Sequence, residues 1–448
     1  MKKKFSVLIN KKINKFNKTI AAPSDKSLSI RVLLFASQCI GVSNIKNLLE
    51  SEDVLNCVKA LRTLGVKIIK GNGLYKIYGN GFNSFKTKKK TNIFVGNSGT
   101  TARLLMGLLS THPGKFYLYG DASVNKRDMS RIIEPLEKIG AYFYPKGKKT
   151  LPLTIEGTNF PLAQTHIEHL GSAQVKSCIL LAAQNIAGIS TIKEKKISRN
   201  HSEILLKNIS ADIKVKKLKN INLITLRGQK NLHAFDYTVS SDPSSAAFLI
   251  ALTLLTPESK LVIHNVLCNS TRTGFIKVLK EKMNANIKIK NLKKISGENV
   301  GSIIVSGSKL KSINLSGNIG ALIDELPILF IISALTKGIS KFNSIEELKN
   351  KESNRILESK KILTQAGIKC KITKNSMKIY GNDKIKTQNK SIVVKTVSDH
   401  RICMSSAIFS LATGIKVKID NFETVNTSFP KFISLIRLLG GKIEIKKS

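Results

Sequence analysis

The arginines of this chain are few, and most of them lie in short polar motifs. Of the 74 Lys and Arg residues only 11 are Arg, and six of these stand in segments rich in Gly, Ser, Asn or Asp: Arg31, Arg103, Arg127, Arg199, Arg355 and Arg401. A planar guanidinium binds phosphate or carboxylate through two parallel hydrogen bonds, which an ammonium group cannot do. These six arginines therefore predict binding sites for anions. Of the other five, Arg131 is an alternative to Arg127, and the rest are interpreted as surface residues without such a role: Arg62, Arg227, Arg272 and Arg437.

The first half of the chain repeatedly places polar groups at a predicted helix start. In the segment 23–35, Ser24 or Asp25 is the expected N-cap of a helix. In the segment 94–109, a glycine-containing turn precedes a helix expected to open at Thr100. Backbone N–H groups and the helix dipole at such ends favour an oxyanion. The candidate ligands here are Lys26, Ser27, Arg31, Gly99, Arg127 (preferred over Arg131), Ser172, Gln174 and Arg199.

The acidic candidates come only from the second half. Asp324 stands in the apolar segment GALIDELPILF, where a carboxylate is costly unless it is paired or used, and where desolvation would raise its pKa. Glu352 lies between Lys351 and Arg355, which are four residues apart, and Arg401 is expected in the first turn of a helix. Carboxylates among cations predict acid–base chemistry on an anionic substrate.

Composition excludes several classes of protein. The formal charge of +45 is nearly all Lys spread along the 448 residues, and the chain has no Trp, so a base-stacking nucleic-acid surface is not favoured. The six Cys form no CxxC pair, which argues against a disulfide framework and against zinc. The pair His166 and His169 has no third metal ligand in view, so no metal is expected. The N-terminal segment lacks a signal-peptide core and no stretch is long enough to span a membrane, which predicts a cytoplasmic protein.

The elements that must position these residues recur six times. Each unit has a helix that ends at a small-residue stop and runs into a strand pair, and the stops follow one another by 70 to 83 residues. The stops are Gly65, Gly140, Ser210, Asn284, Gly367 and Gly440. Three units precede residue 240 and three follow it, and the polar breakers at 23 and at 240–245 predict two domains. The predicted ranges are 1–20 plus 241–448 for one domain and 21–240 for the inserted one, with a hinge over a cleft.

Nine motifs in order resemble the family of 5-enolpyruvylshikimate-3-phosphate synthases, in its second sequence class. They are PSDKSLSIR, GNSGTTARLL, GDASVNKRDMSRIIEPL, SAQVKS, SRNHSE, DPSSAAF, IDELP, KESNR and DHRICMS, and they cover nearly the whole chain. The resemblance implies the two-domain α/β enolpyruvyl transferase fold, in which each domain has three βαβαββ units. It also implies transfer of the enolpyruvyl group of phosphoenolpyruvate to the 5-hydroxyl of shikimate 3-phosphate, without a cofactor or metal, and inhibition by glyphosate.

The resemblance assigns roles to individual residues. Those implied for shikimate 3-phosphate are Lys26, Ser27, Arg31, Ser172, Gln174, Arg199, Asp324 and Lys351. Those implied for phosphoenolpyruvate are Lys26, Gly99, Arg127, Gln174, Arg355 and Arg401. The implied catalytic groups are Asp324 as base for the hydroxyl, Glu352 as the acid that protonates the methylene carbon, and Lys26. Two departures from the family are Asn354 in place of the usual Asp, and the absence of a Lys from TVNTSFP at 424–430.

Two other functions stay open at this point. A UDP-N-acetylglucosamine enolpyruvyl transferase would be expected to show Lys-Asn rather than Lys26-Ser27 and a reactive loop Cys, yet no Cys lies between residues 58 and 177. A basic nucleic-acid-binding protein would explain the charge but not the carboxylates or the repeat. The expected partners are the two small substrates only, and the expected assembly is a monomer.

Overall fold

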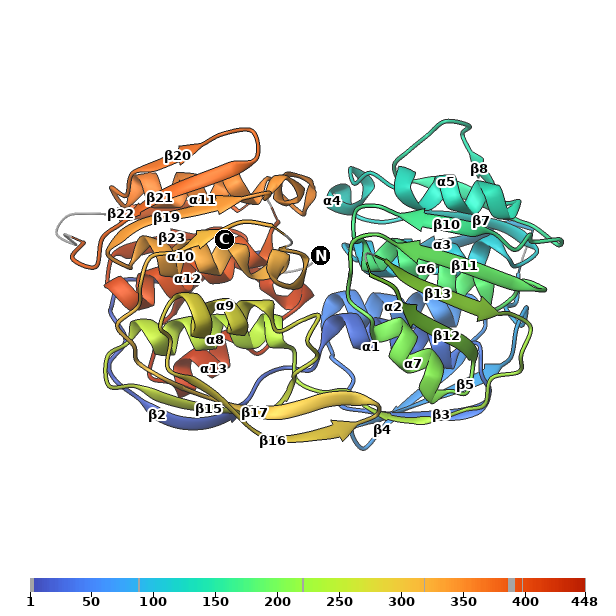
Figure 1. The fold of residues 1–448 in the computed structure, drawn as a ribbon, viewed down its shortest axis with the longest axis horizontal. Helices are drawn as coiled ribbons and strands as arrows, with labels where there is room; N and C mark the ends of the chain where they lie inside the picture. Colours follow the sequence, from blue (N-terminus) through green and yellow to red (C-terminus); the bar gives the residue numbers. More distant parts are fainter. Residues whose placement is uncertain are drawn as a thin grey trace. The chain divides into compact units, whose positions relative to one another are not determined.

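The computed structural model describes residues 4–87, 89–219, 221–317, 319–385, 391–396 and 398–447. The chain forms two units, of which unit 1 comprises Met1–Pro23, Ser241–Lys293 and Asn299–Ser448 and unit 2 comprises Ser24–Ser240 and Lys294–Glu298 (Figure 1). Relative to the predicted ranges, residues 21–23 fall in unit 1 and residues 294–298 fall in unit 2. Residues 1–3 of the predicted first segment lie outside the described residues.

The described strands of unit 2 form three four-stranded sheets, with the orders β14-β3-β5-β4, β6-β7-β9-β8 and β10-β11-β13-β12. The strands are β3 Ile40–Lys46, β4 Lys67–Gly71, β5 Leu74–Asn80, β6 Thr91–Phe94, β7 Gly114–Tyr119, β8 Tyr142–Tyr144, β9 Leu153–Gly157, β10 Thr165–Glu168, β11 Ile189–Glu194, β12 Asp212–Lys217, β13 Asn222–Arg227 and β14 Asp236–Thr238. Each sheet has one parallel pair at an edge, and its other pairs are antiparallel.

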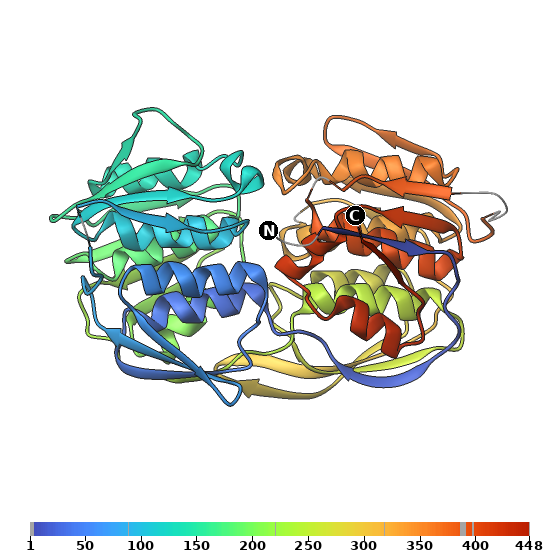
Figure 2. The ribbon, with the colours of Figure 1, turned by 180° about the vertical axis from the view of Figure 1, so that it is seen from behind.

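Unit 1 repeats this arrangement in its described part, with the orders β16-β17-β15-β2, β18-β19-β21-β20 and β22-β23-β1-β24. The strands are β1 Phe5–Ile9, β2 Asn17–Ala21, β15 Lys260–Leu267, β16 Ile287–Ile295, β17 Glu298–Ser306, β18 Asn314–Leu315, β19 Gly338–Asn343, β20 Cys370–Ile372, β21 Ser376–Gly381, β22 Ser391–Val394, β23 Lys416–Ile419 and β24 Glu444–Lys447. The N-terminal strand β1 lies between β23 and the C-terminal β24, antiparallel to both (Figure 2).

The strands β2 and β14 each pair in the unit opposite to that of the helix that follows them in the chain. The β2 strand precedes the first helix of unit 2 but pairs in parallel with β15 of unit 1, whereas β14 pairs in parallel with β3 of unit 2. The chain therefore leaves unit 1 after Pro23 and returns to it at Ser241. Allowing for this exchange, each unit holds three βαβαββ repeats, so the predicted fold is confirmed.

The first helix of each repeat is buried almost all round. These inner helices are α1 Lys26–Ala36, α3 Gly99–Ser110 and α6 Ala173–Ala183 in unit 2, and α8 Pro243–Leu255, α10 Leu326–Ala334 and α12 His400–Thr413 in unit 1. In unit 2, α3 packs on both α1 and α6, and in unit 1 α8, α10 and α12 pack on one another. The helices α8 and α10 are apolar on every side and must lie in the interior. The other four inner helices bury several polar side chains as well. The N-terminal ends of the six inner helices carry six of the nine sequence motifs, whereas the motifs of Arg127, Arg199 and Arg355 lie at or before other helices.

The second helix of each repeat lies on the outside and ends at its predicted stop. These helices are α2 Glu52–Thr63, α5 Ser130–Ile139, α7 His201–Asn208, α9 Gly274–Lys282, α11 Arg355–Gln365 and α13 Phe432–Leu438. Shorter helical segments are α4 Ala122–Asn125, η1 Gly320–Glu325, η2 Glu346–Asn350 and η3 Phe422–Thr427. All six stops have positive φ, between 60° at Asn284 and 110° at Gly140. A residue in this left-handed conformation ends a helix, so the six-fold punctuation of the sequence is confirmed.

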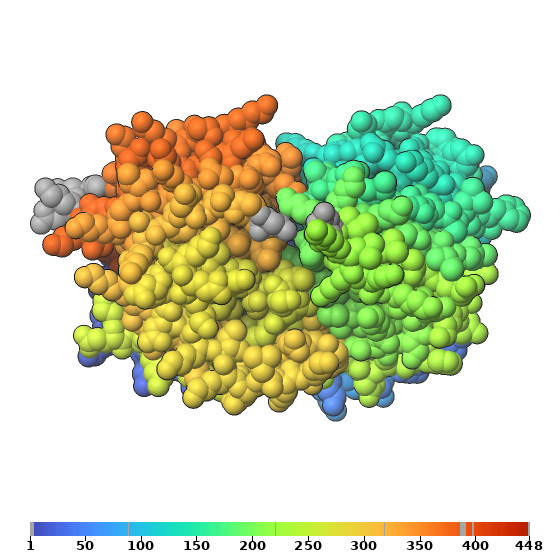
Figure 3. Space-filling model, in the orientation of Figure 1, coloured from blue at the N-terminus to red at the C-terminus, as the bar shows by residue number. Residues whose placement is uncertain are grey.

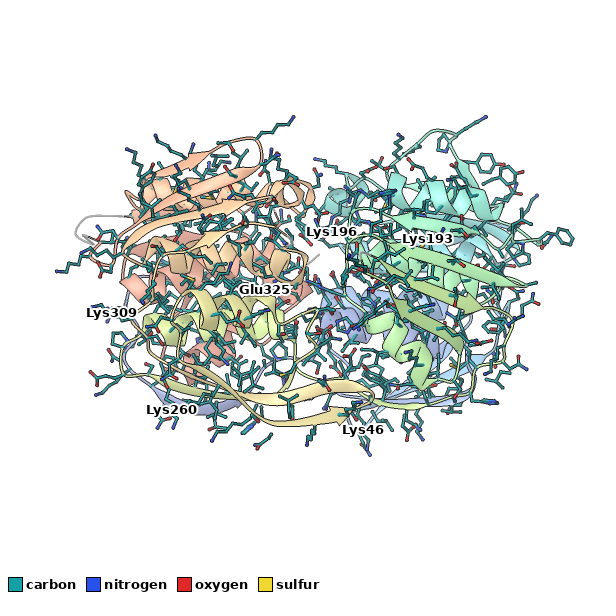
Figure 4. The ribbon with its side chains drawn as sticks, in the orientation of Figure 1. Lys46, Lys193, Lys196, Lys260, Lys309 and Glu325 are labelled. Carbon is teal, nitrogen blue, oxygen red and sulfur yellow. The ribbon has the colours of Figure 1, made fainter. Side chains whose placement is uncertain are left out.

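The excess of lysine is a property of the surface. Lys46, Lys193, Lys260 and Lys309 are exposed and come from four different sheets or loops (Figure 4). In the space-filling view, α9, β16 and β17, coloured yellow, form part of the surface of unit 1 (Figure 3). No helix in the described residues is long and apolar enough to cross a membrane.

Candidate functional site

In unit 2, Arg31 joins three helices. Its Nε donates to Ser202 Oγ of α7 at 3.1 Å, its Nη2 to Ser177 Oγ of α6 at 3.0 Å, and its Nη1 to the Ser27 carbonyl at 3.1 Å. The side chain is 3% exposed. The predicted N-cap of this helix is Asp25, whose carboxylate accepts from Leu28 N at 2.7 Å. The structure thus brings the α1 motif next to α6, although 146 residues separate Arg31 from Ser177.

The start of α3 is a second cluster of predicted residues. Gly99 rather than Thr100 is the first residue of this helix, and Ser98 is its N-cap. Arg127 Nη2 donates to Asn97 Oδ1 at 2.6 Å, and its Nη1 lies so near Gly99 that an added Cβ would be 2.6 Å away. The Arg127 guanidinium therefore lies against the backbone of the turn at Gly99. An oxyanion bound here could accept hydrogen bonds from both the guanidinium and the backbone N–H groups.

Gln174 connects α6 to this cluster. Its Nε2 donates to Thr100 Oγ1 at 3.0 Å, and its Oε1 accepts from Arg103 Nη1 at 2.6 Å. Ser172 is the N-cap of α6 and accepts from Val175 N at 3.4 Å. The sequence context of Arg103 alone predicted that it binds an anion. In the structure, Arg103 donates a hydrogen bond to the predicted ligand Gln174.

Lys26, and Ser198 beside Arg199, contact carboxylates that sequence reasoning missed. Lys26 Nζ forms an ion pair with Asp53 Oδ2 at 2.9 Å, from the first turn of α2. Beside Arg199, Ser198 donates through N and Oγ to Glu194 Oε1, at 2.9 and 2.6 Å. Glu194 and Glu203 both pair with the fully buried Lys176, at 2.8 and 2.7 Å. Burial raises the pKa of Glu203 despite the attraction of Lys176. Asp53 is 27 residues from Lys26 and Glu194 is 18 residues from Lys176, so no local sequence signal marked these pairs.

In unit 1, Asp324 lies among three cations. Its Oδ1 is 3.5 Å from Arg355 Nη1 and 4.0 Å from Lys351 Nζ, and its Oδ2 is 3.9 Å from Arg401 Nη2. The side chain keeps 19% of its surface exposed. Asp324 comes from η1, while Lys351 precedes α11, Arg355 is the first residue of α11, and Arg401 lies in the first turn of α12. The predicted acidic and basic residues of this half are therefore assembled at one place.

Arg355 is held firmly but retains one open donor. Its Nε donates to Asp399 Oδ2 at 2.9 Å, and its Nη2 donates to Glu352 Oε2. Its Nη1 is buried and has no hydrogen-bond partner in the part of the chain that the structure describes. The pKa of Arg355 rises, because the attraction of Asp399, Glu352 and Asp324 outweighs the opposing effect of burial. Asp399 was missed by the sequence analysis, although it stands two residues before Arg401 as the N-cap of α12.

The departure at Asn354 has a structural explanation. Asn354 is the N-cap of α11, and its Oδ1 accepts from Leu357 N at 3.3 Å. Asn and Asp are about equally good at this position, so the cap survives the change from Asp.

Arg401 and Lys351 complete the cluster. In the described part of the chain, the Arg401 guanidinium has two ion pairs near 4 Å, with Asp324 and Glu325, and no side-chain hydrogen bond. The Arg401 side chain is 11% exposed, and its two ion pairs orient the guanidinium without a side-chain hydrogen bond to any described residue. Burial lowers the pKa of Lys351, with Asp324 opposing that effect and Arg355 adding to it. Together these cations can bind an anion beside a carboxylate that can accept a proton.

A metal site is not assembled around the histidine pair. His166 Nε2 is 3.6 Å from Glu168 Oε2, and within the described residues no group of three or more His, Cys, Asp or Glu side chains could hold a metal ion. All six cysteines are free; four are buried, and Cys268 and Cys370 are half-buried.

Comparison with known proteins gives consistent relatives along the whole chain. The sequence pattern of the family described as EPSP synthase (3-phosphoshikimate 1-carboxyvinyltransferase) matches residues 10–436. The 3-phosphoshikimate 1-carboxyvinyltransferase of Acidiphilium cryptum is 38% identical over 428 residues, which cover 95% of either chain. That of Ruthia magnifica is 38% identical and covers 99% of this chain and 100% of the relative.

Solved structures agree with these relatives. The EPSP synthase of Acinetobacter baumannii superposes with a TM-score of 0.83 at 35% identity, covering 99% of this chain and 100% of the other. The enolpyruvyl transferase NikO of Streptomyces tendae has a TM-score of 0.77 over the full length of both chains, at 11% identity, and so shares the fold.

Proposed function

The chain belongs to the EPSP synthase (3-phosphoshikimate 1-carboxyvinyltransferase) family, and from that premise we propose which of its residues bind the substrates and catalyse the reaction. The enzyme transfers the enolpyruvyl group of phosphoenolpyruvate to the 5-hydroxyl of shikimate 3-phosphate, in the shikimate pathway to aromatic amino acids. This activity replaces the two alternatives that the sequence left open. One observation carries the assignment of residues: open guanidinium donors of Arg355 and Arg401 lie beside Asp324.

The anions of phosphoenolpyruvate need donors that are oriented but unsatisfied. Arg355 Nη1 and the Arg401 guanidinium meet this requirement in unit 1. In unit 2, Arg127 beside Gly99, with Lys26 and Gln174, supplies a second group of donors. Bidentate charge-assisted hydrogen bonds to phosphate and carboxylate explain why Arg is used here rather than the abundant Lys.

Shikimate 3-phosphate is assigned to the remaining polar groups. In unit 2 these are Lys26, Ser27, Arg31, Ser172, Gln174 and Arg199, and in unit 1 they are Asp324 and Lys351. The contact of Arg31 with Ser177 and the N-cap position of Ser172 support this set, because they bring the α1 and α6 helix starts together. Two helix N-termini with a buried guanidinium suit a phosphate group.

The proposed chemistry is an addition followed by an elimination. The 5-hydroxyl oxygen bonds to the carbon that carries the phosphate, Asp324 accepts the hydroxyl proton, and Glu352 donates a proton to the methylene carbon. Loss of phosphate then restores the double bond as a proton leaves the new methyl group. In the free enzyme Arg355 Nη2 donates to Glu352 Oε2, and an anion bound to Arg355 would compete with Glu352 for that guanidinium.

A pair of variants tests these roles. Asp324→Asn keeps the size of the side chain but cannot accept the proton, so phosphate release should fall while calorimetric binding of shikimate 3-phosphate persists. The matched control is Asp383→Asn, because it changes an exposed carboxylate in the same unit. This variant should leave turnover unchanged. Full phosphate release by Asp324→Asn would assign the base elsewhere.

We also propose that the enzyme acts as a monomer in the cytoplasm. The cytoplasm, a reducing compartment, is supported by six cysteines that form no disulfide. Sedimentation of the purified protein and fractionation of cells test the two parts.

A further inference from the structure

Arg272 is a buried residue, which corrects the interpretation of it as a surface arginine. It lies between β15 and α9 and is 4% exposed. Its Nη2 donates to Asp242 Oδ1 at 2.7 Å and to Ser244 Oγ at 3.0 Å. The sequence around it, NSTRTG, is polar and resembles an exposed loop, so the burial depends on Asp242, which stands 30 residues earlier in the chain. A buried guanidinium with a carboxylate partner is a costly feature that calls for a purpose.

The hydrogen bonds from Arg272 have a fixed direction. An arginine N–H can only donate, so Ser244 Oγ is the acceptor in that contact. The single hydroxyl proton of Ser244 is then directed to Glu325 Oε1, which accepts a hydrogen bond from it. Ser244 and Glu325 are both 2% exposed. The result is a polarised chain from Arg272 through Ser244 to Glu325, in which each bond strengthens the next.

The chain ends at the proposed substrate site. Glu325 Oε1 is 4.0 Å from Arg401 Nη1, while Arg401 Nη2 is 3.9 Å from Asp324. Glu325 and Asp324 are neighbours on η1, and Glu325 is labelled within unit 1 in Figure 4. The two adjacent carboxylates thus attract the two Nη atoms of one guanidinium and set its orientation without occupying its donors.

We propose that Arg272 and Ser244 are positioning residues for the phosphoenolpyruvate site, acting through Glu325 on Arg401. They fix the Glu325 carboxylate, and this carboxylate aims the Arg401 guanidinium. The inference rests on the proposed function, in which Arg401 binds phosphoenolpyruvate.

The cleanest test is Ser244→Ala, because it breaks the chain without changing any charge. The KM for phosphoenolpyruvate should rise by roughly tenfold or more, the size of effect that misplacement of a binding group can have, while the KM for shikimate 3-phosphate stays unchanged. Ser245→Ala is the matched control. Ser245 is the next residue of α8, is also buried, and donates to Asp242 Oδ2 at 2.9 Å, away from Glu325. It should leave both KM values unchanged.

The variant Glu325→Gln separates positioning from simple charge. Removing a negative charge beside an anion site should by Coulomb attraction alone lower the KM for phosphoenolpyruvate. If Glu325 acts by aiming Arg401, the KM rises instead. Arg272→Lys keeps the charge but loses the guanidinium, so the KM for phosphoenolpyruvate should rise in this variant too. This variant provides the test if Ser244→Ala fails to fold.

The outcomes distinguish this inference from the proposed function. Arg401→Lys is measured in parallel, and an unchanged KM for phosphoenolpyruvate would reject the role of Arg401 itself. If Arg401→Lys raises that KM but Ser244→Ala and Arg272→Lys, both folded by circular dichroism, do not, only the positioning chain is wrong. An equal rise of both KM values in these variants, or a fall in Glu325→Gln, would also overturn it.

Discussion

Replacing Gly99 by Ala perturbs a contact whose size the structure defines. The added Cβ would lie 2.6 Å from Arg127 Nη1, whereas ordinary contacts begin near 3.4 Å. The guanidinium must therefore shift by about 0.8 Å. It is the far end of a flexible side chain, so the fold can accommodate the move. The position of the donor that faces the ligand cannot stay the same.

The expected magnitude follows from the bonds at risk. A hydrogen bond to a charged group contributes about 1.5–3 kcal/mol, and each 1.4 kcal/mol corresponds to about a tenfold change in affinity. Partial displacement of Arg127 should raise the KM for phosphoenolpyruvate by up to about tenfold. Glyphosate, as the longer ligand implied by the family resemblance, meets the new methyl group as well as the displaced arginine. Its inhibition constant should rise by more than the KM does.

The assay is steady-state phosphate release at varied phosphoenolpyruvate and glyphosate, with denaturant unfolding of the same samples. Gly99 is the first residue of α3 and has no left-handed φ, so Ala should not lower the free energy of unfolding. The matched control is Gly71→Ala, where no atom lies within 4 Å of an added Cβ. Equal rises of the KM and the inhibition constant would refute the reasoning, and so would a wild-type enzyme that is insensitive to millimolar glyphosate.

The remaining predictions concern other residues of the site. Asp324→Asn should lower turnover by roughly 10²–10⁴-fold, as expected for loss of one general base, which single-turnover phosphate release would detect. Because burial lowers the pKa of Lys351, its ammonium should lose its proton below the ordinary pKa of 10.5. The calorimetric affinity for shikimate 3-phosphate should therefore fall as pH rises toward 10.5. Lys351→Arg stays charged and should not show this fall. Arg31→Lys should weaken shikimate 3-phosphate more than phosphoenolpyruvate, and Arg127→Lys the reverse, each by roughly 1.5–3 kcal/mol; equal losses in calorimetry would contradict the assignment. Asn354→Ala should cost about 1 kcal/mol of unfolding free energy through loss of the α11 cap, while Asn354→Asp should keep it; a neutral Ala variant would show the cap to be unimportant.

Local features of the sequence determined much of the architecture. The six stops were visible as small residues after helical periodicity, and all six have positive φ, because a helix end requires a conformation that Gly, Asn and Ser accept. The N-cap Asp25 was one of two candidates visible in the sequence, since capping involves residues within three positions of each other. The inner helices α8 and α10 are apolar on every side and therefore had to be buried.

Only the tertiary structure decided the partners of the charged residues. Arg272 was misread because its counter-ion Asp242 is 30 residues away, and Arg355 was assigned without Asp399, which is 44 residues away. The exchange of β2 and β14 between units was likewise not encoded in either strand alone. The physical reason is that periodicity and capping report on neighbours along the chain. Burial of a charge and the pairing of strands depend on which distant segments the fold brings together, and no local pattern records that choice.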